Sequence, residues 1–458
     1  MKRHAPVRLL FALVAFTGAL PTDAGAIPAF ARRYRTTCAS CHTAAPKLNV
    51  VGEAFRLHGY RLPRFDQALA QETGIPLGDD VWKDLWPRGI WPGEIPSGPP
   101  ISLRVQADVL ARSAGATPSG VQMRLPNEIY LLAAASLGDG LAALVEIEVT
   151  PDEGIEIAQA KLELTDLVRT LPRGALNLWL GRQNPYLFTF ADRQIDHAGI
   201  LDFAWQSYRV DELRLTSGTG TTPLESTNAF RLNQTSPSIE VNGIARGRTY
   251  YGVGVAQGAG SGMDDASARK DLYYKVRHKW GGLRLDGDYD TGAHPPAGGD
   301  GQLWDHAIIV EHFGYFGEAP GTDSTADRHR SFGANIRLLR GPLDVGIGAV
   351  TRRDADPWGT GAAAEMQSQF AKGEYFAWPW LAGTLKLERF VATSDRARGA
   401  GFTRGSEDRL LIAPGIVALL RQNARLVLEG EFYARERSSA EVGRGRTVGL
   451  WTRLDVAF

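Results

Sequence analysis

From residue 101 onward the chain consists of short segments in which apolar and polar residues alternate. Ile101, Leu103, Val105, Ala107 and Val109, for example, alternate with Ser102, Arg104, Gln106 and Asp108. The same period of two recurs over Leu283–Tyr289 and over Leu426–Tyr433, and Gly281-Gly282 predicts a tight turn between Tyr273–Trp280 and the first of these. A period of two is typical of β-strands that have one apolar and one polar face. The sequence therefore predicts a mainly β structure for residues 101–458.

The connections and the C-terminus indicate what kind of β structure this is. Tight turns alternate with long polar segments such as Gln257–Lys270 and Gly314–Arg330, which is typical of outer-membrane β-barrels. The chain ends in an alternating strand that closes on Phe458, and in this it resembles bacterial outer-membrane proteins, whose last strand is the assembly signal. At roughly 9–11 residues per strand plus its connection, the segment accommodates about 16 strands around a wide lumen.

The first 26 residues have the pattern of a secretory signal. Lys2, Arg3 and Arg8 precede an apolar run over Leu9–Leu20, and Ala24-Gly25-Ala26 offers a cleavage site. The apolar run is shorter than the roughly 20 residues that a transmembrane helix requires, and no later run approaches that length. We therefore expect an exported mature chain that begins near Ile27 and has no transmembrane helix.

The overall composition argues against several classes of function. Lys+Arg 51 equals Asp+Glu 51, so no excess of positive charge points to nucleic acid. No nucleophile triad, phosphate-binding loop or HExxH motif points to a hydrolase. The sequence therefore offers no catalytic residues of these kinds, and any chemistry must depend on a different motif.

That chemistry lies in one pentapeptide, which contains both cysteines of the chain. Cys38-Ala39-Ser40-Cys41-His42 has the spacing that attaches haem c, in which the two thiols bond to the porphyrin and the histidine ligates the iron. A redox CxxC motif would need a βαβ pattern around it, and a zinc site would need further ligands at close spacing. Export favours haem attachment, which takes place in the periplasm. We therefore predict one covalent haem c, with His42 as one axial ligand.

The segment Pro46–Tyr60 is predicted to be a helix that packs on the haem. Pro46 suits a first helical turn and Gly59 suits the position just past a helix end. Leu48, Val51, Phe55 and His58 are spaced to share one face, so His58 is the candidate for the second axial ligand. Two alternatives stay open: His58 interacts only with the helix C-terminus, or the sixth iron position is empty. Barrel histidines are further candidates: His197, His278, His294, His306, His312 and His329.

The N-terminal motifs resemble those of the fused monohaem cytochrome–porins of iron-oxidising bacteria. The likeness rests on the segment Ile27–Arg32 that leads to Cys38–His42, and it continues through Pro46, Leu48, Gly52, Phe55, Gly59 and Tyr60. It implies a signal peptide at 1–26, a monohaem cytochrome c domain at 27–66, a Pro/Trp-rich linker at 67–100 and a porin-like outer-membrane barrel at 101–458. The linker contains Trp82, Trp86 and Trp91, which we expect to pack on the cytochrome or on the barrel rim.

The resemblance also implies a function. Members of this family carry electrons across the outer membrane, oxidise extracellular Fe(II) and pass electrons to periplasmic cytochromes or other soluble carriers. Five acids of the predicted lumen could concentrate Fe(II), although polar barrel interiors ordinarily contain paired charges of this kind: Asp286, Asp288, Asp290, Glu429 and Glu431. Two other functions remain open: a diffusion porin with a haem plug or gate, and a haem enzyme of the peroxidase type.

Overall fold

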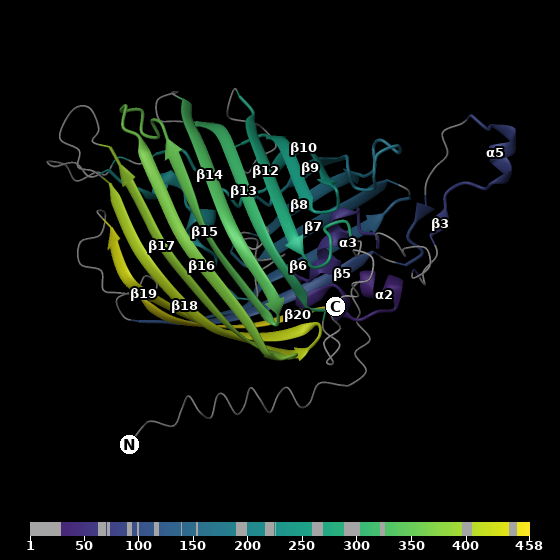
Figure 1. Cartoon of the computed structure of the whole chain (residues 1–458). Helices are drawn as coiled ribbons and strands as arrows, with labels where there is room; N and C mark the ends of the chain where they lie inside the picture. Colours follow the sequence, from purple (N-terminus) through teal and green to yellow (C-terminus); the bar gives the residue numbers. More distant parts are fainter. Residues whose placement is uncertain are drawn as a thin grey trace, which may run out of the picture.

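A closed antiparallel β-barrel of 16 strands dominates the computed structural model (Figure 1). The structure describes residues 29–62, 70, 74–88, 94–98, 100–113, 119–138, 140–152, 154–188, 199–215, 224, 226–258, 269–287, 303–320, 326–395, 405–438 and 447–458. Each strand pairs with its neighbours in the sequence, and the last strand, β20, closes the ring on the first, β5. The prediction of about 16 strands is confirmed.

The strands vary in length, and most of the longer ones lie in the second half of the chain. They are β5 (Ile101–Arg112), β6 (Gly120–Ser136), β7 (Leu141–Thr150), β8 (Gly154–Leu164), β9 (Asn177–Gln183), β10 (Ser236–Ala245), β11 (Thr249–Ala256), β12 (Asp271–Gly281), β13 (Asp305–Pro320), β14 (Ala326–Gly341), β15 (Leu343–Asp354), β16 (Ala364–Trp378), β17 (Leu381–Ser394), β18 (Ser406–Arg421), β19 (Ala424–Ser438) and β20 (Val448–Ala457).

The barrel wall is apolar on its outer face and polar on its inner face. In β14, Asp327, His329 and Asn335 are buried toward the lumen, whereas Phe332 and Ile336 are exposed on the outside. A soluble β-sandwich would bury its apolar face instead. An apolar exterior around a polar interior is the arrangement of a barrel surrounded by lipid. Among the described residues, no helix is long and apolar enough to span a membrane.

Two predictions about the barrel connections are wrong. Gly281-Gly282 does not join two barrel strands, because β12 ends at Gly281 and β13 begins only at Asp305. Leu285 instead packs inside the barrel against Leu57 and Trp179. Gly314–Arg330 is not a long loop, because β13 and β14 occupy most of it. Charged residues of this segment lie on both faces of the wall, so its sequence is as polar as that of a loop although it forms two strands.

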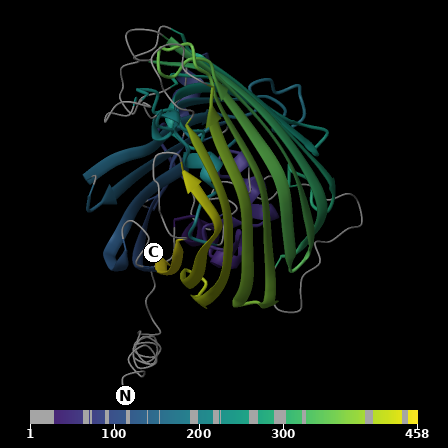
Figure 2. The same ribbon diagram turned by 90° about the vertical axis from the view of Figure 1, so that its left-hand side faces the viewer.

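The N-terminal unit lies inside the barrel rather than beside it (Figure 2). It consists of α2 (Ala29–Tyr34), a 3₁₀ turn (Cys38–Ser40), β1 (His42–Ala44), β2 (Lys47–Leu48) and α3 (Val50–Leu57). Buried ion pairs join it to the inner wall. The Lys47 ammonium lies 2.5 Å from an Asp344 carboxylate oxygen, and the Arg277 guanidinium lies 3.0 Å from a Glu53 carboxylate oxygen. The predicted signal segment, residues 1–26, lies outside the described residues.

A second part of the lumen is filled by the connection between β9 and β10. This connection contains the short helix α6 (Ala204–Ser207), whose Ala204 amide donates to Glu388 of the wall at 2.6 Å. Phe203 and Trp205 pack there against the inward-facing Phe370. The lumen therefore holds a packed aromatic core in addition to the N-terminal unit.

The segment between the N-terminal unit and β5 extends away from the barrel (Figure 1). It contains β3 (Ile75–Pro76), α5 (Val81–Leu85) and β4 (Glu94–Ile95). Trp82 and Trp86 stack on each other with centroids 5.3 Å apart, yet their side chains remain 46% and 59% exposed. The expectation that these two residues pack on the cytochrome or on the rim is therefore wrong, and Trp91 lies outside the described residues.

Candidate haem c site

The CxxCH segment forms a tight turn that directs its side chains to one cavity. The Cys41 amide donates to the Cys38 carbonyl at 3.1 Å, which closes the turn. His42 follows at once, and its Nδ1 lies 3.2 Å from the main-chain oxygen of Pro46. Since a carbonyl only accepts, Nδ1 carries the proton and Nε2 is left as the ring atom that can bind a metal. Burial lowers the pKa of His42, which favours the neutral imidazole that a metal requires.

Asn49 joins this turn to helix α3. Its side-chain oxygen accepts from the amides of Val51 and Gly52, both at 3.0 Å, which is an N-cap. Its side-chain nitrogen donates back to the carbonyls of Ala39 and Ser40. The sequence predicted that the helix begins at Pro46, but it begins at Val50. Sequence reasoning missed Asn49, although an Asn that directly precedes an apolar helical run is a recognisable N-cap signal.

Close packing between the helix and the turn depends on Gly52. A Cβ at this position would lie 2.2 Å from the Cys41 carbonyl oxygen and 2.8 Å from a Leu48 methyl carbon. Only glycine permits this approach. At the other end of the helix, Gly59 has φ +64, a left-handed conformation that suits glycine just past a helix end.

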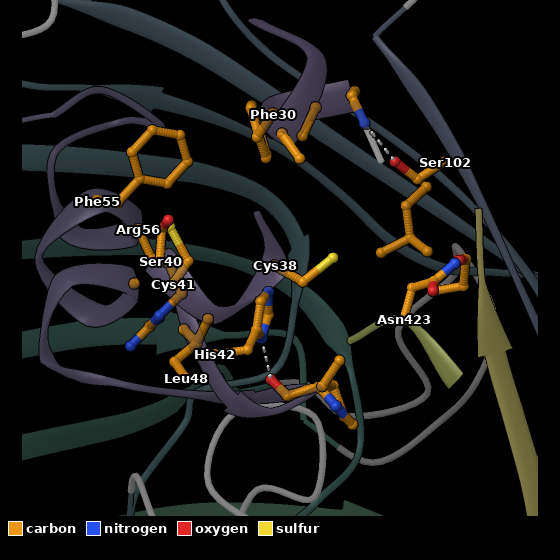
Figure 3. Close-up of a pocket in the computed structure, with 18 of the residues that line it drawn as sticks. Phe30, Cys38, Ser40, Cys41, His42, Leu48, Phe55, Arg56, Ser102 and Asn423 are labelled. Carbon is orange, nitrogen blue, oxygen red and sulfur yellow. Dashed lines mark hydrogen bonds between the residues drawn. The ribbon is translucent and has the colours of Figure 1, made fainter. Parts of the chain in front are cut away.

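The cavity measures about 690 Å³ and is mostly apolar (Figure 3). From the N-terminal unit it is lined by Phe30, Cys38, Cys41, His42, Leu48, Val51 and Phe55. The barrel wall contributes Leu103, Arg104, Tyr130, Leu132, Leu144 and Arg425. Its volume lies within the usual range of cofactor sites, and its lining combines apolar walls with a few polar groups. The two thiols and one imidazole required for haem c lie together in its lining.

One corner of the cavity is rich in guanidinium groups. Arg104 and Arg425 both pair with Asp455, at 2.7 and 3.0 Å. Two guanidiniums that share one carboxylate suit a ligand with carboxylates of its own, such as the propionates of haem. The donor set, the apolar walls and this basic corner all fit haem c.

His58 is not brought to this cavity. Its side chain is buried, and its Nδ1 donates to the Ala54 carbonyl at 2.7 Å. Among the described residues its Nε2 has no hydrogen-bond partner, and it faces Gly174, where a Cβ would lie 3.0 Å from it. His58 does not line the cavity, so this geometry gives no support to its role as second axial ligand. That role stays a prediction.

The barrel histidines considered as alternatives are not brought there either. His306 and His312 are exposed on outward-facing positions, His278 is half-buried on an outward-facing position, and His329 is buried in the lumen against Phe230. His197 and His294 lie outside the described residues. Among the described residues that line the cavity, His42 is the single histidine, and none is methionine.

The acids considered for Fe(II) prove to be paired where the structure describes them. Glu429 lies 2.6 Å from the Lys386 ammonium, and Glu431 lies 2.9 Å from the Arg112 guanidinium. Asp286 pairs with Arg284 in a turn, not on a strand. Asp288 and Asp290 lie outside the described residues. The described part of the chain contains no cluster of three or more metal-binding side chains. Asp286, Glu429 and Glu431 are therefore ordinary paired charges.

The fold defines a class: a 16-stranded barrel of the outer-membrane porin type. Among solved structures, the anion-selective porin from Comamonas acidovorans superimposes with a TM-score of 0.51 at 13% identity, over 78% of this chain and 98% of that one. The outer membrane channel DcaP of Acinetobacter baumannii gives a TM-score of 0.49 at 10% identity, over 78% and 96%. Salmonella typhi OmpF, solved with daunomycin, gives 0.47 at 10% identity, over 78% and 97%. No family model matches the sequence, and no curated protein does. The porin fold is therefore shown by structure alone.

Proposed function

We propose that this chain is an outer-membrane electron-transfer protein that holds one covalent haem c inside a porin-type barrel. Cys38 and Cys41 would hold the porphyrin and His42 would ligate the iron. When bound, the haem supplies a one-electron redox centre. The observation that carries the proposal is that the three attachment residues line the same cavity, which also has apolar walls and a basic corner.

The position of the cavity suits electron exit toward the periplasm. Its lining includes Ala457, next to the C-terminus, and Asn423 in the tight turn between β18 and β19. Figure 1 shows the C-terminus beside α2. In outer-membrane barrels the short turns face the periplasm. A periplasmic c-type cytochrome or another soluble carrier would therefore meet the haem end, and most of the longer connections would face the extracellular donor.

The filled lumen supports an electron conduit over a diffusion porin. The N-terminal unit is fixed to the wall by buried ion pairs, and the connection between β9 and β10 adds an aromatic core around Trp205. Electrons cross a packed protein medium, whereas hydrated solutes need open water. The resemblance of the N-terminal motifs to the cytochrome–porins supports Fe(II) as the donor.

A haem enzyme of the peroxidase type is the second candidate. The observation that favours it is the lack of a second histidine or methionine among the described residues that line the cavity. An empty sixth position on the iron is what a peroxidase requires. A low-spin ferric spectrum would exclude this candidate.

The decisive experiment uses the full chain in liposomes that contain an oxidised c-type cytochrome. Fe(II) added outside should reduce first the haem of the protein and then the entrapped cytochrome. The double variant Cys38→Ser/Cys41→Ser should lose haem staining on a denaturing gel and transfer no electrons, whereas Ala39→Ser in the same turn should retain both. Undiminished haem staining in the double variant would overturn the cofactor assignment. A wild-type haem that dithionite reduces but Fe(II) does not would overturn the donor alone.

A further inference from the structure

A second concave site lies on the outside of the barrel, at the end opposite the haem cavity. It has a volume of about 440 Å³ and is lined by five cations from two strands and one adjoining segment: Arg269, Lys270, Arg328, Arg330 and Arg353. The strand ends that form it, at Asp271, Pro320, Ala326 and Asp354, lead into the connections of the far barrel end. The haem cavity and this pocket therefore share no residue.

The alternation of the strands places these cations outside. Along β14, Arg328 and Arg330 are exposed whereas His329 between them is buried, and along β15 Arg353 is exposed whereas Arg352 and Asp354 are buried. The side chains of Arg269 and Arg328 are both 67% exposed. The guanidinium groups are therefore accessible to a ligand outside the barrel.

Two cations of like charge are direct neighbours in this pocket. Arg330 of β14 and Arg353 of β15 are direct cross-strand partners, and like charges at such positions repel each other. Arg353 also pairs with Glu365, and Glu318 lies 4.0 Å from Arg269 and 3.7 Å from Arg328. Among the described residues, Arg330 makes no ion pair. An anion bound here would relieve the repulsion.

Apolar side chains continue the pocket toward the middle of the barrel. Leu272 and Phe316 line it on the same outer face, and Phe332 packs edge-on against Phe316 with ring centroids 5.4 Å apart. Cations at the rim above an exposed apolar surface match a lipid that has an anionic headgroup and hydrocarbon tails. A small free anion would make no use of the apolar part.

We propose that this pocket binds the phosphorylated headgroup of a lipid in the outer leaflet. The planar guanidiniums of Arg328, Arg330 and Arg353 suit bidentate contacts with phosphate oxygens, and Leu272 and Phe316 would contact the acyl chains. The Glu318 carboxylate orients Arg269 and Arg328 at the pocket edge. The proposal rests on the barrel spanning the outer membrane and does not depend on the haem.

Binding is tested on the purified full-length protein in uncharged detergent, with bis-phosphorylated lipid A as the probe. Arg330→Gln should weaken binding about tenfold, and Arg328→Gln/Arg330→Gln/Arg353→Gln about a hundredfold or more, as expected when charge-assisted hydrogen bonds are lost. Arg389→Gln, an outward-facing arginine of β17 outside this pocket, is the matched control and should bind as the wild type does. All variants should keep the heat-modifiable gel migration of a folded barrel.

Two further arms separate the possible ligands. Lipid A without its phosphates should bind no better to the wild type than to the triple variant; equal binding of both lipids to the wild type would overturn the proposal. Displacement of lipid A by millimolar inorganic phosphate alone would show a free-anion site and would overturn the lipid assignment. Equal weakening by Arg389→Gln would also overturn the proposal, because it would show nonspecific attraction to the charged surface.

Discussion

The Nδ1 atom of His42 lies 3.2 Å from the main-chain oxygen of Pro46, four residues along the chain. This contact fixes the tautomer of the imidazole and leaves Nε2 as the ring atom that can bind a metal, as is usual for metal-binding histidines. Pro46 therefore orients the His42 imidazole, and it does not begin the following helix. Asn49 carries out that second task as the N-cap, and it also holds the carbonyls of Ala39 and Ser40 in the cysteine turn.

The position of His58 gives a first prediction. Since His58 faces Gly174 and does not line the cavity, His58→Gln should leave the ferric absorption spectrum of the haem unchanged. The measurement is the Soret and charge-transfer bands of the purified protein, with His329→Gln as the control for loss of another buried histidine. A conversion from low-spin to high-spin iron in His58→Gln alone would show that His58 moves to the iron and is its second ligand.

This difference shows where sequence periodicity stops being informative. The helical spacing correctly placed Val51 and Phe55 on the cavity-facing side of α3, whereas Leu48 lines the cavity from β2, outside the helix. His58, however, is the C-cap of α3, and there the backbone turns away at Gly59. Helical periodicity no longer applies to a residue at the helix end, so the direction of its side chain depends on the barrel wall that it meets.

The barrel itself was predictable because an alternating pattern repeats along the whole segment. Its strand number followed from length, and the C-terminal strand from its alternation up to Phe458. The contents of the lumen were not predictable. Ion pairs such as Lys47–Asp344 join residues that are far apart in sequence, and Leu285 is inside only because Leu57 and Trp179 are there to cover it. The local pattern of apolar and polar residues contains no information on partners that are distant in the sequence.

Gly52→Ala provides a second prediction. The added methyl would meet the Cys41 carbonyl oxygen, and the helix would have to move away from the cysteine turn. We expect a local destabilisation of about 1–3 kcal/mol, the usual cost of overpacking. Hydrogen exchange of the α3 amides should accelerate accordingly. Gly383→Ala on β17 is the control, since no described residue other than its chain neighbours lies within 4 Å of a Cβ there, and it should leave exchange in α3 unchanged.

The Lys47 ion pairs give a third prediction, about how firmly the N-terminal unit is held. Lys47 is buried and contacts both Asp344 and Glu374 of the wall. Lys47→Met should weaken this attachment by about 1–3 kcal/mol, because each carboxylate loses one cation but keeps another, Arg337 or Lys372. Limited proteolysis of the N-terminal unit, at bonds that do not involve residue 47, should become faster. Lys83→Met removes an exposed ion pair and should not change the cleavage rate.

Glu53 leads to a fourth prediction, a dependence on pH. Burial alone would raise the pKa of its carboxyl, but Arg277, Arg337, Lys279 and Arg56 outweigh burial and lower this pKa from 4.5 to about 2. A folded-state pKa below the unfolded one means that the ionised carboxylate stabilises the seated unit above pH 4.5, and that this contribution is lost as the pH falls toward 2. Its size is about 3 kcal/mol by the usual conversion. The unit should therefore stay seated in mild acid.

The measurement for Glu53 is hydrogen exchange in α3 as a function of pH. The difference between wild type and Glu53→Gln should be largest above pH 4.5 and should shrink steadily between pH 4.5 and 2. Tyr60→Phe, which removes the 3.3 Å hydrogen bond to Glu163 but no carboxyl of the N-terminal unit, should differ from the wild type by an amount that is less dependent on pH in this range. A Glu53 difference that is constant from pH 7 to pH 2 would contradict the assigned pKa.

The last prediction concerns ion flow through the barrel. Because the N-terminal unit and the aromatic core around Trp205 both lie in the lumen, the wild-type protein in a planar bilayer should conduct ions far less than open porins of the same strand number. Replacing residues 199–215 by a short glycine–serine linker removes Phe203, Trp205 and Tyr208 together with the anchor to Glu388, and should raise the single-channel conductance several-fold. Haem staining should persist in this variant, because no removed residue lines the haem cavity. Trp82→Ala/Trp86→Ala, on the segment outside the barrel, should leave conductance at the wild-type level. A wild-type conductance equal to that of an open porin would contradict the filled lumen and would favour the diffusion-porin function over the electron conduit.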